Sequence, residues 1–184
     1  MIKTKRLVLK PHTMANAEKL NQWQNDAELS YYDDDGPEHN EPVSLDRTKR
    51  YLERISNVSD SDDIIRFAIH NNTELIGFCM IAFIDKHNRS CKVGITIGEK
   101  QEWGQGLGRE ALEAMVAYCF SDLGMNRIGA EIFDFNARSL RLFSGQGFRQ
   151  EGRIRQAIYK RGQFCDEIVM GLLRNEWERS SPRH

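Results

Sequence analysis

The sequence predicts an α+β fold, in which one mixed, mostly antiparallel sheet carries flanking helices. Short β-rich runs bounded by turn residues alternate with segments whose apolar residues recur at helical spacing. The resulting order, β-α-α-β-β-β-α-β-α-β-β, contains too few βαβ units for a doubly wound parallel sheet. The length of 184 residues and the 40% apolar content suit one hydrophobic core. We therefore expect a single domain over residues 1–174 and a polar C-terminal tail at residues 175–184.

The amino-terminal third is predicted to hold one strand and two helices. Residues 6–10 form a strand that ends at Pro11, and a helix follows over residues 15–25. Residues 31–42 are rich in acidic residues, Gly and Pro, so a loop is expected there. Ser44 can then cap a second helix, in which four residues recur at helical spacing: Leu45, Thr48, Leu52 and Ile55.

The centre of the chain is predicted to be mainly β. Residues 64–70 and 75–84 are β-rich runs joined by a polar turn, which indicates a hairpin. Residues 91–98 alternate between larger and smaller side chains and form a further strand. A helix over residues 109–123 follows, and it is expected to stop near Gly124.

The carboxyl-terminal third carries similar signals. A strand at residues 127–133 and a helix at residues 137–146 precede two final strands between residues 150 and 173. The turn that joins these two strands is Arg161-Gly162. The polar end after Arg174 is expected to fray.

Composition argues against several classes of protein. The formal net charge is −1, with acidic and basic residues interspersed, so we expect no nucleic-acid partner. The longest apolar run, residues 75–84, is far shorter than the roughly 20 residues of a membrane helix, and no apolar secretory segment follows the basic start. The four cysteines lack CxxC spacing and the histidines are scattered, which predicts reduced thiols and no metal site. A cytoplasmic protein is therefore expected, without a membrane partner.

A glycine-rich turn leads from the strand at residues 91–98 into the following helix, with the sequence Trp103-Gly104-Gln105-Gly106-Leu107-Gly108. Backbone N–H groups of such a turn can converge on a pyrophosphate, and the helix start adds unsatisfied donors and partial positive charge. The alternative is a tight turn that needs glycine only for its geometry. A dinucleotide fingerprint would need Gly or Ala where the chain has Arg109, and the Gly-Lys-Ser/Thr of a P-loop is missing.

With these elements in view, the sequence closely resembles the GNAT acetyltransferase superfamily. Within it, the ribosomal-protein alanine N-acetyltransferases and the spermidine acetyltransferases are nearest. The resemblance implies an acyl-CoA N-acyltransferase fold, acetyl-CoA as co-substrate and an amine as acceptor. Its most specific motifs are Gly104-Gln105-Gly106-Leu107-Gly108-Arg109-Glu110-Ala111, Asn126-Arg127-Ile128, Asn136-Ala137-Arg138-Ser139 and Gly147-Phe148.

The resemblance also implies roles for individual residues. The backbone of Ile95, Thr96 and Ile97, at the splayed end of their strand, pairs with the pantetheine arm of CoA. Asn136 bonds the lower part of CoA, and a helix cap is the alternative role for this residue. The loop that wraps the pyrophosphate consists of Trp103, Gly104, Gln105, Gly106, Leu107, Gly108 and Arg109.

Two positions depart from the pattern of the family. Trp103 stands where the family often has Gln or Arg. Phe143 stands where many members carry a Tyr that protonates the departing thiolate, and a phenyl ring cannot donate a proton. Ser139, near the start of the short helix, is the candidate catalytic residue as a polar group near the sulfur. Its alternative is a first-turn serine that faces solvent or backbone.

The acceptor amine must lose its proton before it attacks the thioester. An α-amine with a pKa near 8 is roughly 10% neutral at pH 7, whereas a lysine-like amine is about 0.04% neutral. The sequence shows no His-carboxylate pair at a suitable spacing. This favours an α-amine as acceptor, or a base that acts through water.

An acidic loop lies between the first two predicted helices, where the family usually builds its acceptor side. Its carboxylates can attract a cationic acceptor, and Tyr31, Tyr32 and Trp23 can line the same wall. A solvated loop and simple core packing are the alternatives. The acidic residues are Asp33, Asp34, Asp35, Glu38 and Glu41.

Three functions stay open from the sequence. Acetylation of a protein N-terminal α-amine is the one we favour. Acetylation of a polyamine or another small amine is the second, and a non-catalytic sensor that binds acetyl-CoA is the third. The protein is expected to be a monomer or a homodimer.

Overall fold

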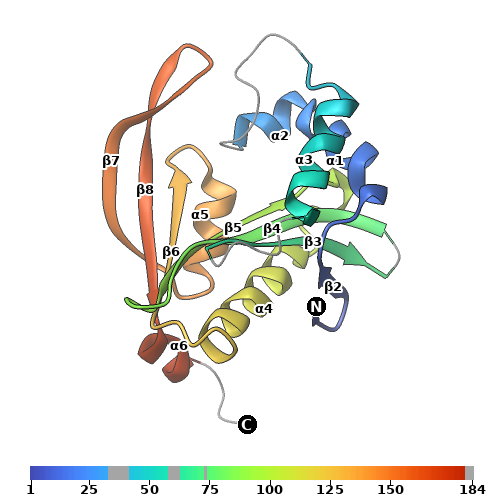
Figure 1. The fold of residues 1–184 in the computed structure, drawn as a ribbon. Helices are drawn as coiled ribbons and strands as arrows, with labels where there is room; N and C mark the ends of the chain where they lie inside the picture. The colour runs from blue at the N-terminus through green and yellow to red at the C-terminus, as the bar shows by residue number, and fades with distance from the viewer. Residues whose placement is uncertain (33–41, 58–62, 73, 181–184) are drawn as a thin grey trace.

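The structure is a computed structural model that describes residues 1–32, 42–57, 63–72 and 74–180. Its described strands form one eight-stranded sheet in the order β1-β2-β3-β4-β5-β6-β8-β7 (Figure 1). Among them, β5 and β6 pair in parallel and the other neighbours pair antiparallel. The predicted fold class is therefore confirmed. The strands are β1 (Ile2–Lys3), β2 (Leu7–Lys10), β3 (Ile65–Asn71), β4 (Glu74–Asp85), β5 (Ser90–Ile97), β6 (Arg127–Phe133), β7 (Arg149–Lys160) and β8 (Gln163–Leu173).

Helices cover both faces of this sheet (Figure 1). The described α-helices are α1 (Ala17–Gln24), α2 (Ala27–Tyr32), α3 (Leu45–Asn57), α4 (Leu107–Ser121), α5 (Ala137–Ser144) and α6 (Arg174–Ser180). Two 3-10 turns, η1 (Met14–Asn16) and η2 (Lys100–Glu102), precede α1 and the glycine-rich turn. None of the described helices is both long and apolar enough to cross a membrane.

Two hydrophobic clusters lie on opposite faces of the sheet. The larger cluster packs α4, through Leu112 and Met115, against strand residues such as Ile76 and Val93. The smaller cluster packs α1 and α3 against the other face, with Trp23 as its largest buried side chain. Alternate residues of a strand point to opposite faces, so β3 contributes Ile69 to the larger cluster and Ala68 to the smaller one, and β4 contributes Ile76 and Leu75 in the same way.

The parallel pair β5 and β6 separates after a short ladder. The pairing register covers Ser90–Lys92 with Arg127–Gly129, although β5 continues to Ile97 and β6 to Phe133. Strand β6 instead keeps its partner β8 over its whole length. The carboxyl-terminal half of β5 therefore lacks a ladder on the side that faces β6, as the resemblance implied for Ile95–Ile97.

Three elements of the structure differ from expectation. Strand β1 was not predicted. Helix α2 was not predicted either, and only its last two residues, Tyr31 and Tyr32, lie in the segment expected to be a loop. The Asp26 carboxylate caps this helix by accepting from the N–H groups of Glu28 and Leu29.

The end after Arg174 was predicted to fray, and this prediction is wrong for the described residues, which form α6 as far as Ser180. The Trp177 ring packs 5.2 Å from the Phe120 ring, centroid to centroid. Glu176 also accepts a hydrogen bond from the N–H of Leu173 at the start of the helix. An apolar anchor and a cap therefore order a segment that composition alone marks as polar.

Candidate active site

The glycine-rich turn has a left-handed backbone at two positions. Gly104 has a φ of +77° and Gly106 a φ of +79°, and Gly106 is the residue that precedes the first turn of α4. A Cβ added at Gly104 would meet nothing within 4 Å, so this glycine is needed for its backbone conformation and not for space. The first N–H groups of α4 have no partner within the helix, which makes this helix start a suitable site for an anion.

The connection between β1 and β2 supports the glycine-rich turn from outside. The Arg6 guanidinium donates to the carbonyl oxygen of Gln105 over 3.0 Å and forms a 2.6 Å ion pair with Glu110. Thr4 donates its hydroxyl to the same carboxylate over 2.6 Å. Burial raises the pKa of Glu110, but these bonds outweigh it and leave the pKa below its usual value. Glu110 therefore stays ionised and ties the turn to the start of the chain.

Trp103 connects the turn to the end of β5. Its indole N–H donates to the carbonyl oxygen of Ile97 over 2.7 Å. The Arg138 guanidinium lies 4.5 Å above the Trp103 ring, which joins the turn to the first turn of α5. The presence of Trp at position 103, where the family often has Gln or Arg, thus has a structural explanation. Its indole N–H satisfies the carbonyl group at the end of β5.

The amino-terminal end of α5 holds two of the predicted site residues. The Asn136 side chain accepts from the N–H of Ser139 over 3.1 Å, so the helix-cap role of Asn136 is confirmed. Ser139 is half-buried in the first helical turn. Phe143 is 2% exposed, and its ring lies 5.0 Å from the Phe148 ring at an edge-on angle of 81°.

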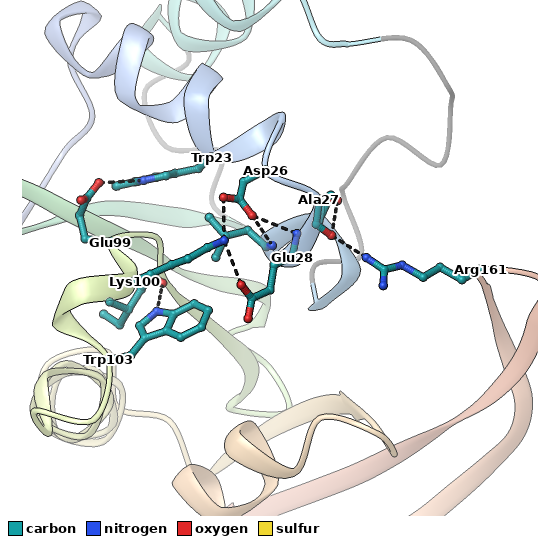
Figure 2. A network of polar contacts seen from close by, with 11 residues as sticks. Trp23, Asp26, Ala27, Glu28, Glu99, Lys100, Trp103 and Arg161 are labelled. Carbon is teal, nitrogen blue, oxygen red and sulfur yellow. Dashed lines mark hydrogen bonds and ion pairs between the residues drawn. The ribbon is translucent and has the colours of Figure 1, made fainter.

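The segment that follows β5 also holds a buried carboxylate, Glu99. The indole N–H of Trp23 donates to it over 3.0 Å (Figure 2). Lys19 forms a 2.7 Å ion pair with it, and Gln101 donates to it over 2.8 Å. Burial alone raises the pKa of Glu99, but these donors hold it below its usual value. This carboxylate is ionised and fully engaged, and it is a poor proton acceptor.

Helix α2 lies between the two separated strand ends. Lys100, just after β5, bonds both Asp26 and Glu28 over 2.8 and 2.9 Å (Figure 2). At the other end of α2 the Tyr31 ring stacks on Phe135, just after β6, with a centroid distance of 4.6 Å. A short helix is thus attached to the residues that follow each of the two diverging strands.

Three of the predicted acceptor-side residues lie within the described ranges, and Tyr31 has this bridging position. The Tyr32 ring lies beside the rings of Tyr31 and Phe135, whereas Trp23 is buried in the smaller hydrophobic cluster. The other predicted acceptor residues, Asp33, Asp34 and Asp35, and their neighbours Glu38 and Glu41 lie outside the described residues. Sequence reasoning missed Glu99, Lys100 and Phe135. Their partners are far away in the chain, so local patterns carry no signal for them.

The strands around β6 also carry paired charges. Lys92 of β5 forms an ion pair with Glu131 of the neighbouring strand β6. Arg153 of β7 bonds both Asp134 and Asp166. Each of these three carboxylates has a cationic partner. Among the described residues, no group of three or more His, Cys, Asp or Glu side chains is placed to hold a metal ion.

Comparison with known proteins agrees with this arrangement. The model of the acetyltransferase (GNAT) domain family matches residues 6–149. An uncharacterized N-acetyltransferase p20 of Bacillus licheniformis is 28% identical over 176 residues, which are 95% of this chain and 96% of the relative. The [ribosomal protein uS5]-alanine N-acetyltransferase of Escherichia coli is 30% identical over 105 residues, 56% of this chain and 54% of the relative.

A solved structure has the same fold over nearly its whole length. The spermidine N-acetyltransferase of Vibrio cholerae, in complex with CoA and spermine, superposes with a TM-score of 0.81 at 20% identity, and covers 95% of this chain and 99% of its own. The chain belongs to the GNAT acetyltransferase family, and it is an acetyl-CoA-dependent N-acetyltransferase. The resemblance predicted from the sequence is therefore confirmed.

Proposed function

We propose that the protein transfers acetyl from acetyl-CoA to the N-terminal α-amine of a protein. The observation that carries this choice is the pairing of charge on and next to β6 and β8, which we assign to the acceptor side. Glu131, Asp134 and Asp166 each bond a cationic side chain. A pocket for a polyamine needs carboxylates that have no cationic partner within the protein and can therefore bind the ligand. A site for a peptide needs hydrogen-bonding groups and room for the peptide chain.

The separated strands support the placement of the co-substrate. Pantetheine contains two amide groups, which match the backbone edge of Ile95, Thr96 and Ile97 that β6 leaves without a ladder. In this proposal the pyrophosphate lies at residues 103–109, against the start of α4. Asn136 caps α5 through its side-chain oxygen, so its amide nitrogen is the group assigned to CoA.

The chemistry that these groups supply is binding and charge stabilisation. The neutral amine attacks the thioester carbon, the C–S bond breaks as the C–N bond forms, and the thiolate leaves with the electron pair of the C–S bond. The nitrogen releases its extra proton to water, which gives the neutral amide. Glu99 has a lowered pKa and three donors, so it does not accept the proton. An α-amine, of which roughly 10% is neutral at pH 7, needs little help from a base. Ser139 remains the candidate polar group near the sulfur.

Acetylation of a polyamine is the second candidate. The Vibrio cholerae structure that shares the fold contains spermine, and the acidic residues Asp33, Asp34 and Asp35 are suited to attract a polycation. Replacing these three residues by Asn distinguishes the two candidate functions. If the loop recruits a polyamine, the substitution raises the KM for spermidine and removes the salt dependence of that KM. The KM for acetyl-CoA stays unaffected.

A panel of amines tests the proposal directly. The protein is incubated with acetyl-CoA and either peptides with free N-termini, the same peptides blocked at the N-terminus but carrying lysine, or spermidine. Free thiol and product mass are measured. Acetylation of free N-termini at the highest kcat/KM is expected. Preference for spermidine overturns the assignment of the acceptor, and binding of acetyl-CoA without turnover of any amine favours the sensor. The cytoplasm, where such N-termini emerge, is the proposed location.

A further inference from the structure

We propose that Arg161 is a positioning residue for the acceptor, because it fastens the turn between β7 and β8 to helix α2. This inference deepens the proposed function by naming a residue that holds the acceptor-side wall. Figure 2 shows the Arg161 side chain reaching from the hairpin turn towards Ala27 at the start of α2.

Two contacts join Arg161 to α2. Its guanidinium donates to the carbonyl oxygen of Ala27 over 2.9 Å, across 134 positions of the chain. The same group lies 4.3 Å from the centroid of the Tyr31 ring. A guanidinium combines a directed hydrogen bond with a planar face that stacks on an aromatic ring, and a shorter polar side chain at this position supplies neither over this distance.

The backbone at Arg161 is unfavourable for arginine. Residues Arg161 and Gly162 form a two-residue turn between the paired residues Lys160 and Gln163, with φ values of +48° and +83°. Two positive φ values define the turn type that favours Asn, Asp or Gly at its first position. Local preference therefore argues against Arg here, and the contact with α2 gives a reason for it.

The contact closes a circuit of elements on the acceptor side. Tyr31 stacks on Phe135, which follows β6, and β6 pairs with β8. Strand β8 pairs with β7, and the turn between them returns to α2 through Arg161. Lys160 lies over the Phe133 ring inside this circuit, at 5.5 Å from its centroid. Loss of Arg161 leaves α2 attached through Lys100 and Phe135 but frees it from the hairpin.

The test uses a substitution that improves the turn and removes the contact. Arg161→Asn suits a positive φ, so the melting temperature is expected to stay level or rise. The acceptor KM is expected to rise about tenfold, since a charged hydrogen bond and a cation–π contact are lost together. The acetyl-CoA Kd should not change. Amide exchange of residues 27–32 should become faster. Arg161→Lys keeps a donor and a charge, and it should restore the KM to within about threefold of wild type.

A matched control lies in the same hairpin. Gln156 has a φ of +53°, and its N–H bonds the Asp166 carboxylate. Gln156→Asn relieves the same kind of strain, and it should leave the acceptor KM and the exchange of α2 as in wild type. An unchanged KM and unchanged exchange in Arg161→Asn would overturn the proposal, and so would an equal effect of Gln156→Asn.

The measurements separate this proposal from the proposed function. The kinetic test uses whichever amine the wild type acetylates fastest, so a preference for spermidine overturns the α-amine assignment and leaves the test of Arg161 valid. Hydrogen exchange of α2 needs no acceptor. If no amine is acetylated, unchanged exchange in Arg161→Asn still overturns the role of Arg161.

Discussion

The regions that we propose as the cofactor side and the acceptor side of this protein are built in different ways. Strand β5, the glycine-rich turn and α4 follow one another without interruption between Ser90 and Ser121. The wall around α2 is assembled from distant segments, because Lys100, Phe135 and Arg161 all meet residues 26–31. The first region is formed by backbone groups that are consecutive in the chain. The second is held together by contacts between side chains of distant segments.

This difference predicts how each side responds to mutation. The cofactor side depends on φ values and on helix N–H groups, so it is sensitive to glycine and tolerant of many side-chain changes. The acceptor side depends on individual cations and rings, each of which adds a modest amount of binding energy. Large single effects are expected at the turn, and several smaller effects around α2.

The largest expected effect comes from Gly106→Glu on acetyl-CoA binding. A carboxylate at the start of α4 repels the pyrophosphate, and a repulsion of about 3 kcal/mol corresponds to a rise of about 100-fold in Kd. Calorimetry measures this on protein whose circular dichroism is unchanged. Gly124→Glu is the control, since Gly124 also has a left-handed φ, +69°, and an added Cβ there meets nothing within 4 Å. Equal affinities in the two variants would show that the turn does not bind the pyrophosphate.

Phe143 tests whether a core residue on the cofactor side has a chemical role. Phe143→Leu keeps an apolar surface without adding a donor, so kcat should fall less than tenfold, since general acid help is typically worth about 10²–10⁴-fold. Phe148→Leu removes the other ring of the same buried pair and serves as the control. Phe143→Tyr raises kcat if its hydroxyl reaches the leaving thiolate. A loss above 100-fold in Phe143→Leu alone contradicts a purely packing role.

A smaller effect is expected from the ion pairs of Lys100 with Asp26 and Glu28. Lys100→Met should raise the acceptor KM about threefold and leave the acetyl-CoA KM unchanged, because the pairs are partly exposed and weak. Lys100→Arg should restore the acceptor KM. Arg149→Met breaks an exposed pair with Glu176, outside the site, and should change neither constant. A rise in the acetyl-CoA KM instead of the acceptor KM would show that Lys100 contributes to binding of acetyl-CoA and not of the acceptor.

The sequence predicted those parts of the molecule in which neighbours in the chain are neighbours in space. The glycine turn, the strand before it and the helix after it were all located, although α4 begins at Leu107 and not at residue 109. The charged and aromatic contacts of α2 were not. Helix α2 itself was missed because six residues carry little periodic signal, and its stability comes from the Asp26 cap and from Lys100 and Arg161.

The individual site residues show the same limit. The sequence left a cap and a CoA contact as alternative roles for Asn136, and the structure shows the cap because that bond lies within the chain. Trp103 departs from the pattern of the family, and its bond to the Ile97 carbonyl explains the exception only in three dimensions. The ion pair of Lys92 with Glu131 depends on the pairing of two strands that are distant in the chain, which a linear pattern does not encode.

The smallest expected effect on turnover comes from Glu99, where the two regions meet. Glu99→Gln should leave the pH dependence of kcat unchanged, because this carboxylate is held by Lys19 and Trp23 and does not accept the proton of the amine. Stability should fall instead, by about 1–3 kcal/mol at pH 7, since hydrogen bonds to a buried charge are lost. The folded-state pKa lies below the ordinary value of 4.5, so this stabilisation is present above pH 4.5 and disappears as the pH falls through the folded-state pKa. Urea unfolding at pH 7 and at lower pH should show the difference between Glu99→Gln and wild type shrinking in acid. If the substitution removes the acidic limb of the pH profile of kcat, Glu99 is the general base. The site would then supply a strong proton acceptor, which an α-amine does not require, and an α-amine would no longer be favoured as the acceptor.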